Sequence, residues 1–109
     1  MNWIDLDDIA LRHELTGQGT HTVVLLHELG GSLESFDSLT PLLTARAPVL
    51  RYDLRGAGLS EQPRRAFSFD DHVDDFGKLL AALEISPPIH IAGVAAGAAI
   101  AVSFALAHP

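Results

Sequence analysis

Three glycine-containing segments bring together residue types that could bind and activate a small molecule. They are residues 27–31 (HELGG), 53–60 (DLRGAGLS) and 93–97 (GVAAG), and each directly follows or completes an apolar run. Open parallel sheets bind their ligands beyond the carboxyl ends of the strands, where loops of this kind lie. We therefore expect the three segments to form one small-molecule site.

A glycine-rich turn between a strand and a helix can also bind phosphate, so a nucleotide site is the first alternative. No G-x-G-x-x-G follows the first apolar run, and G-x-x-x-x-G-K-[ST] occurs nowhere in the chain. The chain has no cysteine, and no pair of its six histidines has the spacing of metal ligands. We predict no nucleotide, no other cofactor and no metal.

In this order and spacing, the three segments resemble the motifs of the α/β-hydrolase fold family. That family carries H-G-x-x-G after its first buried strand, D-x-R-G-x-G-x-S after the next, and G-x-S-x-G at a sharp strand-to-helix turn, the nucleophile elbow. The second motif is complete here from Asp53 to Ser60, and the resemblance covers essentially the whole chain. It implies an α/β fold, a three-layer sandwich with a mainly parallel sheet and an N-terminal antiparallel hairpin.

The third motif departs from the family at its central residue. Ala95 stands where the family has its nucleophilic serine, so acyl-enzyme chemistry through this position is impossible. Three origins are open: an engineered Ser→Ala exchange, a natural protein with another chemistry or none, and an accidental match. The flanking glycines, Gly93 and Gly97, keep Cβ atoms out of the tight crossing that an elbow requires.

The first motif departs from the family as well. Glu28 replaces the glycine of H-G-x-x-G, and a carboxylate at this place disfavours a second negative charge. Two roles are open for Glu28: a general base or ligand contact, and a structural pairing with Arg55. The resemblance further implies an oxyanion hole made by the backbone N–H groups of Leu29 and Ala96, with His27 in a structural role.

The acid and the histidine of the family's triad follow the serine in chain order. None of the histidines in this chain fills that place. His13 and His21 are expected in the edge hairpin, and His72 on a helix. We therefore expect residues 1–109 to be the N-terminal part of a single α/β-hydrolase domain.

The apolar pattern predicts the elements that position these loops. Two segments at residues 3–7 and 9–16 suggest an edge hairpin, and continuous apolar runs typical of buried parallel strands lie at residues 22–27, 49–53 and 89–94. Helices are expected at residues 32–46, with a break or a new first turn at Pro41, at residues 69–83 and at residues 96–108. In the second helix, an apolar face from Phe69 to Leu83 opposes a solvated face of Asp70, Asp71, Asp74 and Asp75.

The last predicted helix is apolar almost all round, which is typical of a helix covered by protein on every side. The chain as it stands provides too few elements for such a cover. We therefore expect self-association, or a partner that supplies the missing half.

The composition narrows the class of protein. Hydrophobic residues make up 48% and charged residues 19% of the chain, as in soluble globular domains. The net charge of -7 argues against nucleic acid and anionic membrane as partners, because few cations are present to neutralise phosphates. The absence of cysteine and of a signal peptide or membrane span favours the cytoplasm.

The residues thus lead to one function and two alternatives. The resemblance implies a protein that, in its complete form, hydrolyses an ester, a lactone or a carbon–carbon bond of a small molecule, as enol-lactonases do. A non-catalytic relative that only binds a ligand, and an inactive truncated fragment, are the alternatives that Ala95 favours.

Overall fold

A five-stranded sheet forms the middle layer of residues 2–109, the part of the chain that the computed structural model describes. Its strands are β1 (Asn2–Asp5), β2 (Ala10–Thr16), β3 (Thr22–Leu26), β4 (Val49–Tyr52) and β5 (Ile89–Gly93). They lie in the order β1-β2-β4-β3-β5. β1 and β2 form the antiparallel edge hairpin, β2 pairs antiparallel with β4, and β3 runs parallel to both β4 and β5. The predicted fold is confirmed.

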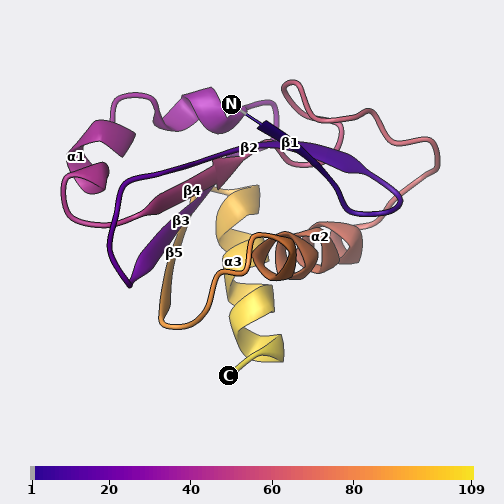
Figure 1. Cartoon of the computed structure of the whole chain (residues 1–109). Helices are drawn as coiled ribbons and strands as arrows, with labels where there is room; N and C mark the ends of the chain where they lie inside the picture. Colours follow the sequence, from indigo (N-terminus) through magenta and orange to yellow (C-terminus); the bar gives the residue numbers. More distant parts are fainter. Residues whose placement is uncertain (1) are drawn as a thin grey trace.

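Helices cover both faces of this sheet (Figure 1). On one face, α2 (Phe69–Ala82) and α3 (Ala96–Ala107) pack against the strands around a core that includes Val24 and Leu26 of β3. On the other face, a 3-10 helix (Leu33–Phe36) and α1 (Thr40–Thr44) cover Leu25 of β3. Successive residues of β3 therefore point into opposite cores, which explains its continuous apolar run.

The prediction of a single interrupted helix over residues 32–46 is only partly right. The 3-10 helix ends at Phe36, and α1 begins at Thr40, with Pro41 in its first turn. Proline cannot donate an N–H and its ring clashes with the carbonyl four residues earlier, so a continuous helix through Pro41 is excluded. The hydroxyl of Thr40 donates to the Phe36 carbonyl at 2.8 Å and holds the two short helices together.

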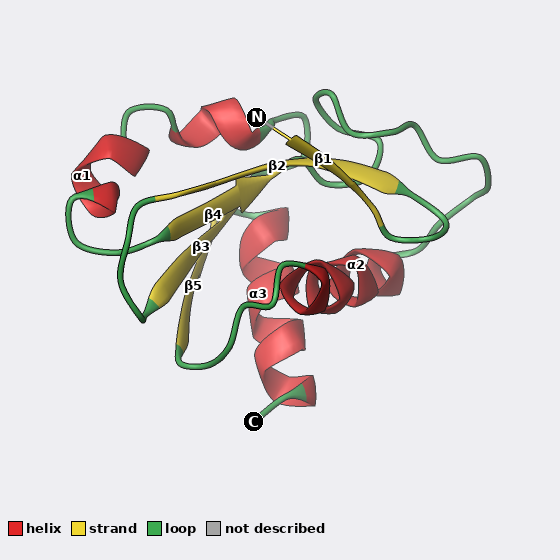
Figure 2. Ribbon diagram, viewed as in Figure 1, coloured by secondary structure: helices red, strands yellow, loops and turns green. Residues whose placement is uncertain are grey.

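A long loop, residues 53–68, connects β4 to α2 (Figure 2). It is fastened to the edge hairpin by several hydrogen bonds, three of which lie near the tip of the loop. The Trp3 indole N–H donates to the Leu59 carbonyl at 2.9 Å. The backbone of Ala10 donates to the Glu61 carboxylate and accepts from the Glu61 N–H, both at 2.9 Å. The hairpin thus acts as a support for the loop that follows β4.

The apolar helix α3 is only partly covered. Within residues 2–109, β5 pairs with β3 alone, and Val94, Val102 and Leu106 are 50%, 59% and 78% exposed. None of the helices in this range has the length and apolar character needed to cross a bilayer. Exposed large apolar side chains such as Val102 and Leu106, one turn apart on α3, are typical of a surface that contacts other protein.

We expect the 109-residue chain to self-associate through this surface. The double variant Val102→Glu with Leu106→Lys places charges on it, so sedimentation velocity should show more monomer than for the unaltered chain. Leu42→Glu is the matched control, because Leu42 is 72% exposed on α1, at the opposite face of the sheet. A chain that is monomeric without any substitution would contradict this expectation.

Candidate functional site

The three glycine-containing loops meet at one edge of the sheet, because β3, β4 and β5 are parallel and end there. His27, which follows β3, accepts a hydrogen bond at Nε2 from the Leu54 N–H after β4, at 3.0 Å. Val94, which follows β5, donates its N–H to the Leu26 carbonyl at the end of β3, at 3.1 Å. The loop after β3 is therefore joined to both of the others.

The turn between β5 and α3 is strained at Ala95. This residue has φ 53° and ψ -114°, a conformation that side-chain-bearing residues rarely adopt, and it is exposed at the tip of the turn. Helix α3 crosses so close to β3 that a Cβ atom on Gly97 would run into the Leu26 carbonyl, and one on Gly93 would run into Gly97. Glycine at both places is thus a requirement of the crossing.

His27 fixes the peptide between Glu28 and Leu29. Because Nε2 of this buried ring accepts from Leu54, the proton of the neutral imidazole lies on Nδ1, which donates to the Glu28 carbonyl at 2.7 Å. The Gly31 N–H donates to the same carbonyl at 3.0 Å. In a trans peptide the N–H points opposite to the carbonyl, so these two bonds turn the Leu29 N–H away from the interior of the loop.

The Asp53 carboxylate makes the buried polar contacts that hold the loops of the site. Its side chain is fully buried, and its carboxylate accepts from the backbone N–H groups of Leu33 and Leu59 at 2.7 and 2.8 Å. The same carboxylate pairs with the buried guanidinium of Arg12, whose Nε lies at 2.6 Å. With these bonds Asp53 holds strand β2 and the loops after β3 and β4 in place. All of its oxygens are engaged, so it has a structural role.

Arg12 extends this network to the 3-10 helix. Its guanidinium also pairs with Glu34, and these hydrogen bonds hold the pKa of Glu34 at about 2. They raise the pKa of Arg12 as well, together with its bonds to Asp53. Arg12 and Glu34 therefore keep their charges over the whole physiological pH range.

A second buried ion pair corrects two expectations. Asp75, expected on the solvated face of α2, is 2% exposed, and its carboxylate binds the Arg55 guanidinium with two bonds of 2.8 Å. Arg55 therefore pairs with Asp75. The structural pairing of Arg55 with Glu28, one of the two roles left open for Glu28, is wrong. The guanidinium lies 5.7 Å from the ring centre of Phe67 and forms a longer contact of 3.5 Å with Asp8.

Glu28 and Leu29 lie on the outer side of the loop after β3. The Glu28 side chain is partly buried against Gly31, and its carboxylate accepts from the Ser35 hydroxyl at 3.3 Å. Leu29 is 73% exposed. Ala96 is the first residue of α3, directly after Ala95. The structure thus places all four predicted site residues on the two loops that the Val94 hydrogen bond joins.

A cavity of about 290 Å³ opens beside these loops. His27, Leu29 and Gly30 contribute to it from the loop after β3, and His72 from α2. The remaining wall comes from the long loop: Leu54, Arg55, Gly56, Ala57, Gln62, Pro63 and Phe67. Sequence reasoning placed His72 on a helix but did not assign it to this cavity. The apolar spacing of α2 does not indicate that the long loop folds back over the first turn of this helix.

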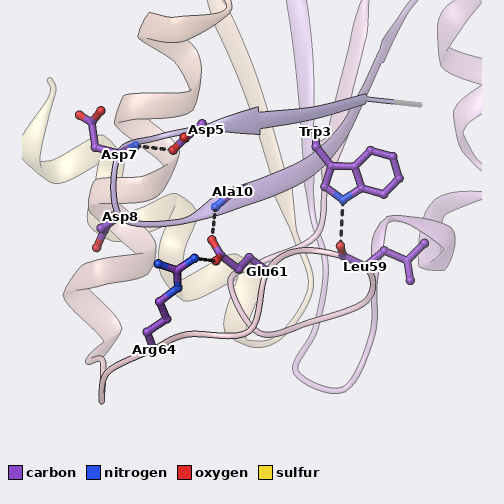
Figure 3. Close-up of a pocket in the computed structure, with 8 residues that line it drawn as sticks. All are labelled: Trp3, Asp5, Asp7, Asp8, Ala10, Leu59, Glu61 and Arg64. Carbon is purple, nitrogen blue, oxygen red and sulfur yellow. Dashed lines mark hydrogen bonds and ion pairs between the residues drawn. The ribbon is translucent and has the colours of Figure 1, made fainter.

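A larger hollow of about 530 Å³ lies away from the elbow, between the edge hairpin and the long loop (Figure 3). Its polar groups bond largely to one another: Asp5 accepts from the Asp7 N–H at 2.9 Å, and Glu61 pairs with Arg64 at 3.0 Å. Among residues 2–109, no three His, Cys, Asp or Glu side chains are arranged to hold a metal ion. This hollow marks the place where the loop is fastened to the hairpin.

The predicted place of one histidine, His21, is wrong. It was expected in the edge hairpin with His13, but it lies in the connection just before β3. His13 is in β2, as expected. His13 and His72 are both buried, and the Nδ1 atoms of both rings have no hydrogen-bond partner. Burial lowers the pKa of each of the two imidazoles.

Comparison with known proteins agrees with this geometry. Residues 21–109 match the family described as the alpha/beta hydrolase fold. This stretch includes all three glycine-containing loops and every element from β3 to α3. The chain therefore belongs to the α/β-hydrolase fold family.

Individual relatives carry different names. The magnesium-chelatase 30 kDa subunit of Rhodobacter capsulatus is 40% identical over 88 residues, which cover 80% of this chain and 31% of that protein. A hydrolase from Pseudomonas aeruginosa PA01 superposes with a TM-score of 0.91 at 30% identity, over 99% of this chain and 41% of that one. The enol-lactonase from Burkholderia xenovorans LB400 gives a TM-score of 0.92 at 25% identity, over 98% and 42%. The chain thus spans less than half the length of these relatives.

Removal of the Asp53 carboxylate should destabilise the fold strongly. Asp53→Ala leaves the buried Arg12 guanidinium with only the half-exposed Glu34 as partner and removes the acceptor of the Leu33 and Leu59 N–H groups, so we expect the free energy of unfolding in urea to fall by about 3–5 kcal/mol. Asp37→Ala is the control: Asp37 pairs with Arg51 at 2.6 Å but its side chain is 61% exposed, so its loss should cost less than about 1 kcal/mol. Equal losses for the two variants would contradict the central role of Asp53.

The buried histidines should make stability depend on pH. Their pKa values are lowered in the folded state, so as pH falls below about 6.5 the unfolded chain takes up protons before the folded one does. Stability is therefore fully present above that pH and is lost as the pH falls further. We expect the urea midpoint to drop between pH 7.5 and pH 5.5, and to drop less in His13→Leu and His72→Leu. A midpoint with the same pH dependence in all three proteins would show that these rings do not carry the effect.

Proposed function

We propose that this chain carries the oxyanion-binding part of a small-molecule hydrolase site, with Ala95 at the place of the nucleophile. The bond acted on in the complete protein is an ester, a lactone or a carbon–carbon bond. The single observation that carries the proposal is the strained Ala95 at the tip of the turn between β5 and α3. A protein that needed only a fold would gain stability by relaxing this turn.

The oxyanion hole is formed by the N–H groups of Leu29 and Ala96. The two hydrogen bonds to the Glu28 carbonyl orient the Leu29 N–H, and the Ala96 N–H belongs to the first turn of α3, where N–H groups are free to bind an anion. Two such donors stabilise the negative charge that develops on the carbonyl oxygen of an ester or lactone under attack.

Glu28 is the carboxylate closest in sequence to this hole. Without a hydroxyl at residue 95, the attacking group has to be water, and a carboxylate can take its proton as the water oxygen bonds to the carbonyl carbon and the C=O electron pair moves onto the oxygen in the hole. When that pair re-forms the C=O bond, the bond to the ester or lactone oxygen breaks, and the carboxylate returns the proton to this leaving oxygen. Its hydrogen bond with Ser35 supports the second role, a contact to a polar group of the ligand made from a fixed position. Replacement by glutamine separates the roles, since glutamine keeps the contact but cannot accept the proton.

A ligand-binding protein without catalysis is the alternative, and Ala95 is the observation that favours it. The similarity to the magnesium-chelatase 30 kDa subunit supports it as well, because that name describes no hydrolase. An inactive fragment is the third reading, consistent with the length of the relatives. In each case the partner is a small molecule, and the cytoplasm remains our prediction for its location.

Ala95→Ser in the complete protein tests the proposal. If the elbow and the oxyanion hole are in place, the new hydroxyl should raise the hydrolysis of p-nitrophenyl butyrate by about 100-fold or more, since loss of such a serine costs other hydrolases far more. Ala99→Ser is the matched control, because it adds the same hydroxyl at an exposed position in the first turn of α3, one turn after residue 95. If Ala95→Ser still binds ligand but stays inactive, the enzymatic reading fails and the binding reading replaces it.

A further inference from the structure

Two exposed histidines meet at the end of the sheet opposite the candidate site, where β3 and β5 begin (Figure 1). His90 is in β5 and lies beside Val23 of β3 in the parallel register, and His21 stands two residues before Val23. The two imidazole ring centres are 5.9 Å apart, with 35° between the ring planes. The expectation of no metal rested on spacing along the chain, which cannot indicate a pair that the sheet brings together.

We propose that His21 and His90 bind one divalent transition-metal ion, such as Zn²⁺, between the amino ends of β3 and β5. The neutral imidazole nitrogen is a preferred ligand of zinc, copper and nickel. Among residues 2–109 no group of three His, Cys, Asp or Glu side chains is arranged to hold a metal, so two ring nitrogens are the protein's share of this site. Water completes the coordination, because both side chains face solvent.

The distance between the rings fits a shared ion. Zinc lies about 2.0–2.1 Å from a histidine nitrogen, which places it about 3.2 Å from the centre of the ring. Two ring centres bound to one ion are therefore about 5.2 Å apart at a tetrahedral angle, and about 6.4 Å apart at most. The observed 5.9 Å is within this limit, and small rotations of two exposed side chains reach the tetrahedral distance.

The other histidines are engaged or buried. Both ring nitrogens of His27 have hydrogen-bond partners, and His13 and His72 are buried. His108 is exposed, but its Nδ1 lies 3.1 Å from the Phe104 carbonyl oxygen, and its ring stacks on that of Phe104 at 4.2 Å. The ring that faces His21 is instead a second exposed imidazole.

The place of the pair in the fold gives the ion a structural effect. Within residues 2–109, β5 pairs with β3 alone, and it leads directly into the turn at Ala95. An ion shared by His21 and His90 joins the amino ends of these two strands and thereby holds β5 in the sheet. The net charge of -7 raises the concentration of cations near the chain. The inference involves no hydrolysis and does not rest on the proposed function.

Titration calorimetry with zinc chloride at pH 7.5 tests the inference. The unaltered chain should bind one Zn²⁺ per chain, and Mg²⁺, which prefers oxygen ligands, should not bind. His21→Ala and His90→Ala should each weaken Zn²⁺ binding by about tenfold or more, since loss of a group that merely orients a metal ligand costs other sites about 10- to 100-fold. His108→Ala is the matched control, because it removes an exposed histidine that lies outside the pair.

Two further measurements make the outcome independent of any one variant. In the unaltered chain, the imidazole NMR signals of His21 and His90 should shift together as Zn²⁺ is added. Saturating Zn²⁺ should raise the urea midpoint of the unaltered chain and of His108→Ala, but not of His21→Ala or His90→Ala, because the paired site exists only in the folded state. One ion per two chains, a loss of affinity with only one of the two substitutions, or equal shifts at His108 would overturn the inference.

Discussion

The buried pair between Arg12 and Asp53 is the interaction on which the arrangement of the site depends. Three parallel strands bring three loops to one edge of the sheet, but loops of this length have no fixed shape of their own. One carboxylate at the end of β4 fixes two of them, by accepting from the backbone at Leu33 and Leu59. Its charge is tolerated in the interior only because Arg12 reaches it from β2. The antiparallel hairpin thus supports the functional edge although it contributes no residue to it.

The second constraint is the close crossing of β3 and α3. It requires glycine at Gly93 and Gly97 and leaves Ala95 in a strained conformation at the tip of the turn. The strained turn is present with alanine at residue 95. Together with the His27 hydrogen bond to the neighbouring peptide, it orients the backbone N–H groups that we propose as an oxyanion hole.

The sequence is sufficient to predict features that depend on residues close together in the chain. The strands, the three loops and the need for glycine at the crossing follow from local patterns, and Pro41 marks a real break. Contacts between distant segments could not be predicted in this way. Asp75 was expected on the solvated face of α2 because its helical position is polar, but Arg55, twenty residues earlier, folds back to bind it. For the same reason the cavity at His72 was missed: its walls come from three separate segments.

The most direct test of the account is the free energy of unfolding of Ala95→Gly. Glycine adopts positive φ without strain, so if Ala95 is held at a strained elbow, this substitution should stabilise the fold by about 1 kcal/mol. Ala96→Gly, one residue into α3, should instead destabilise it by roughly 0.5–1 kcal/mol, as glycine does in ordinary helices. If Ala95→Gly also lowers the stability, the turn is relaxed, and the claim that the chain maintains a hydrolase elbow around an alanine is contradicted.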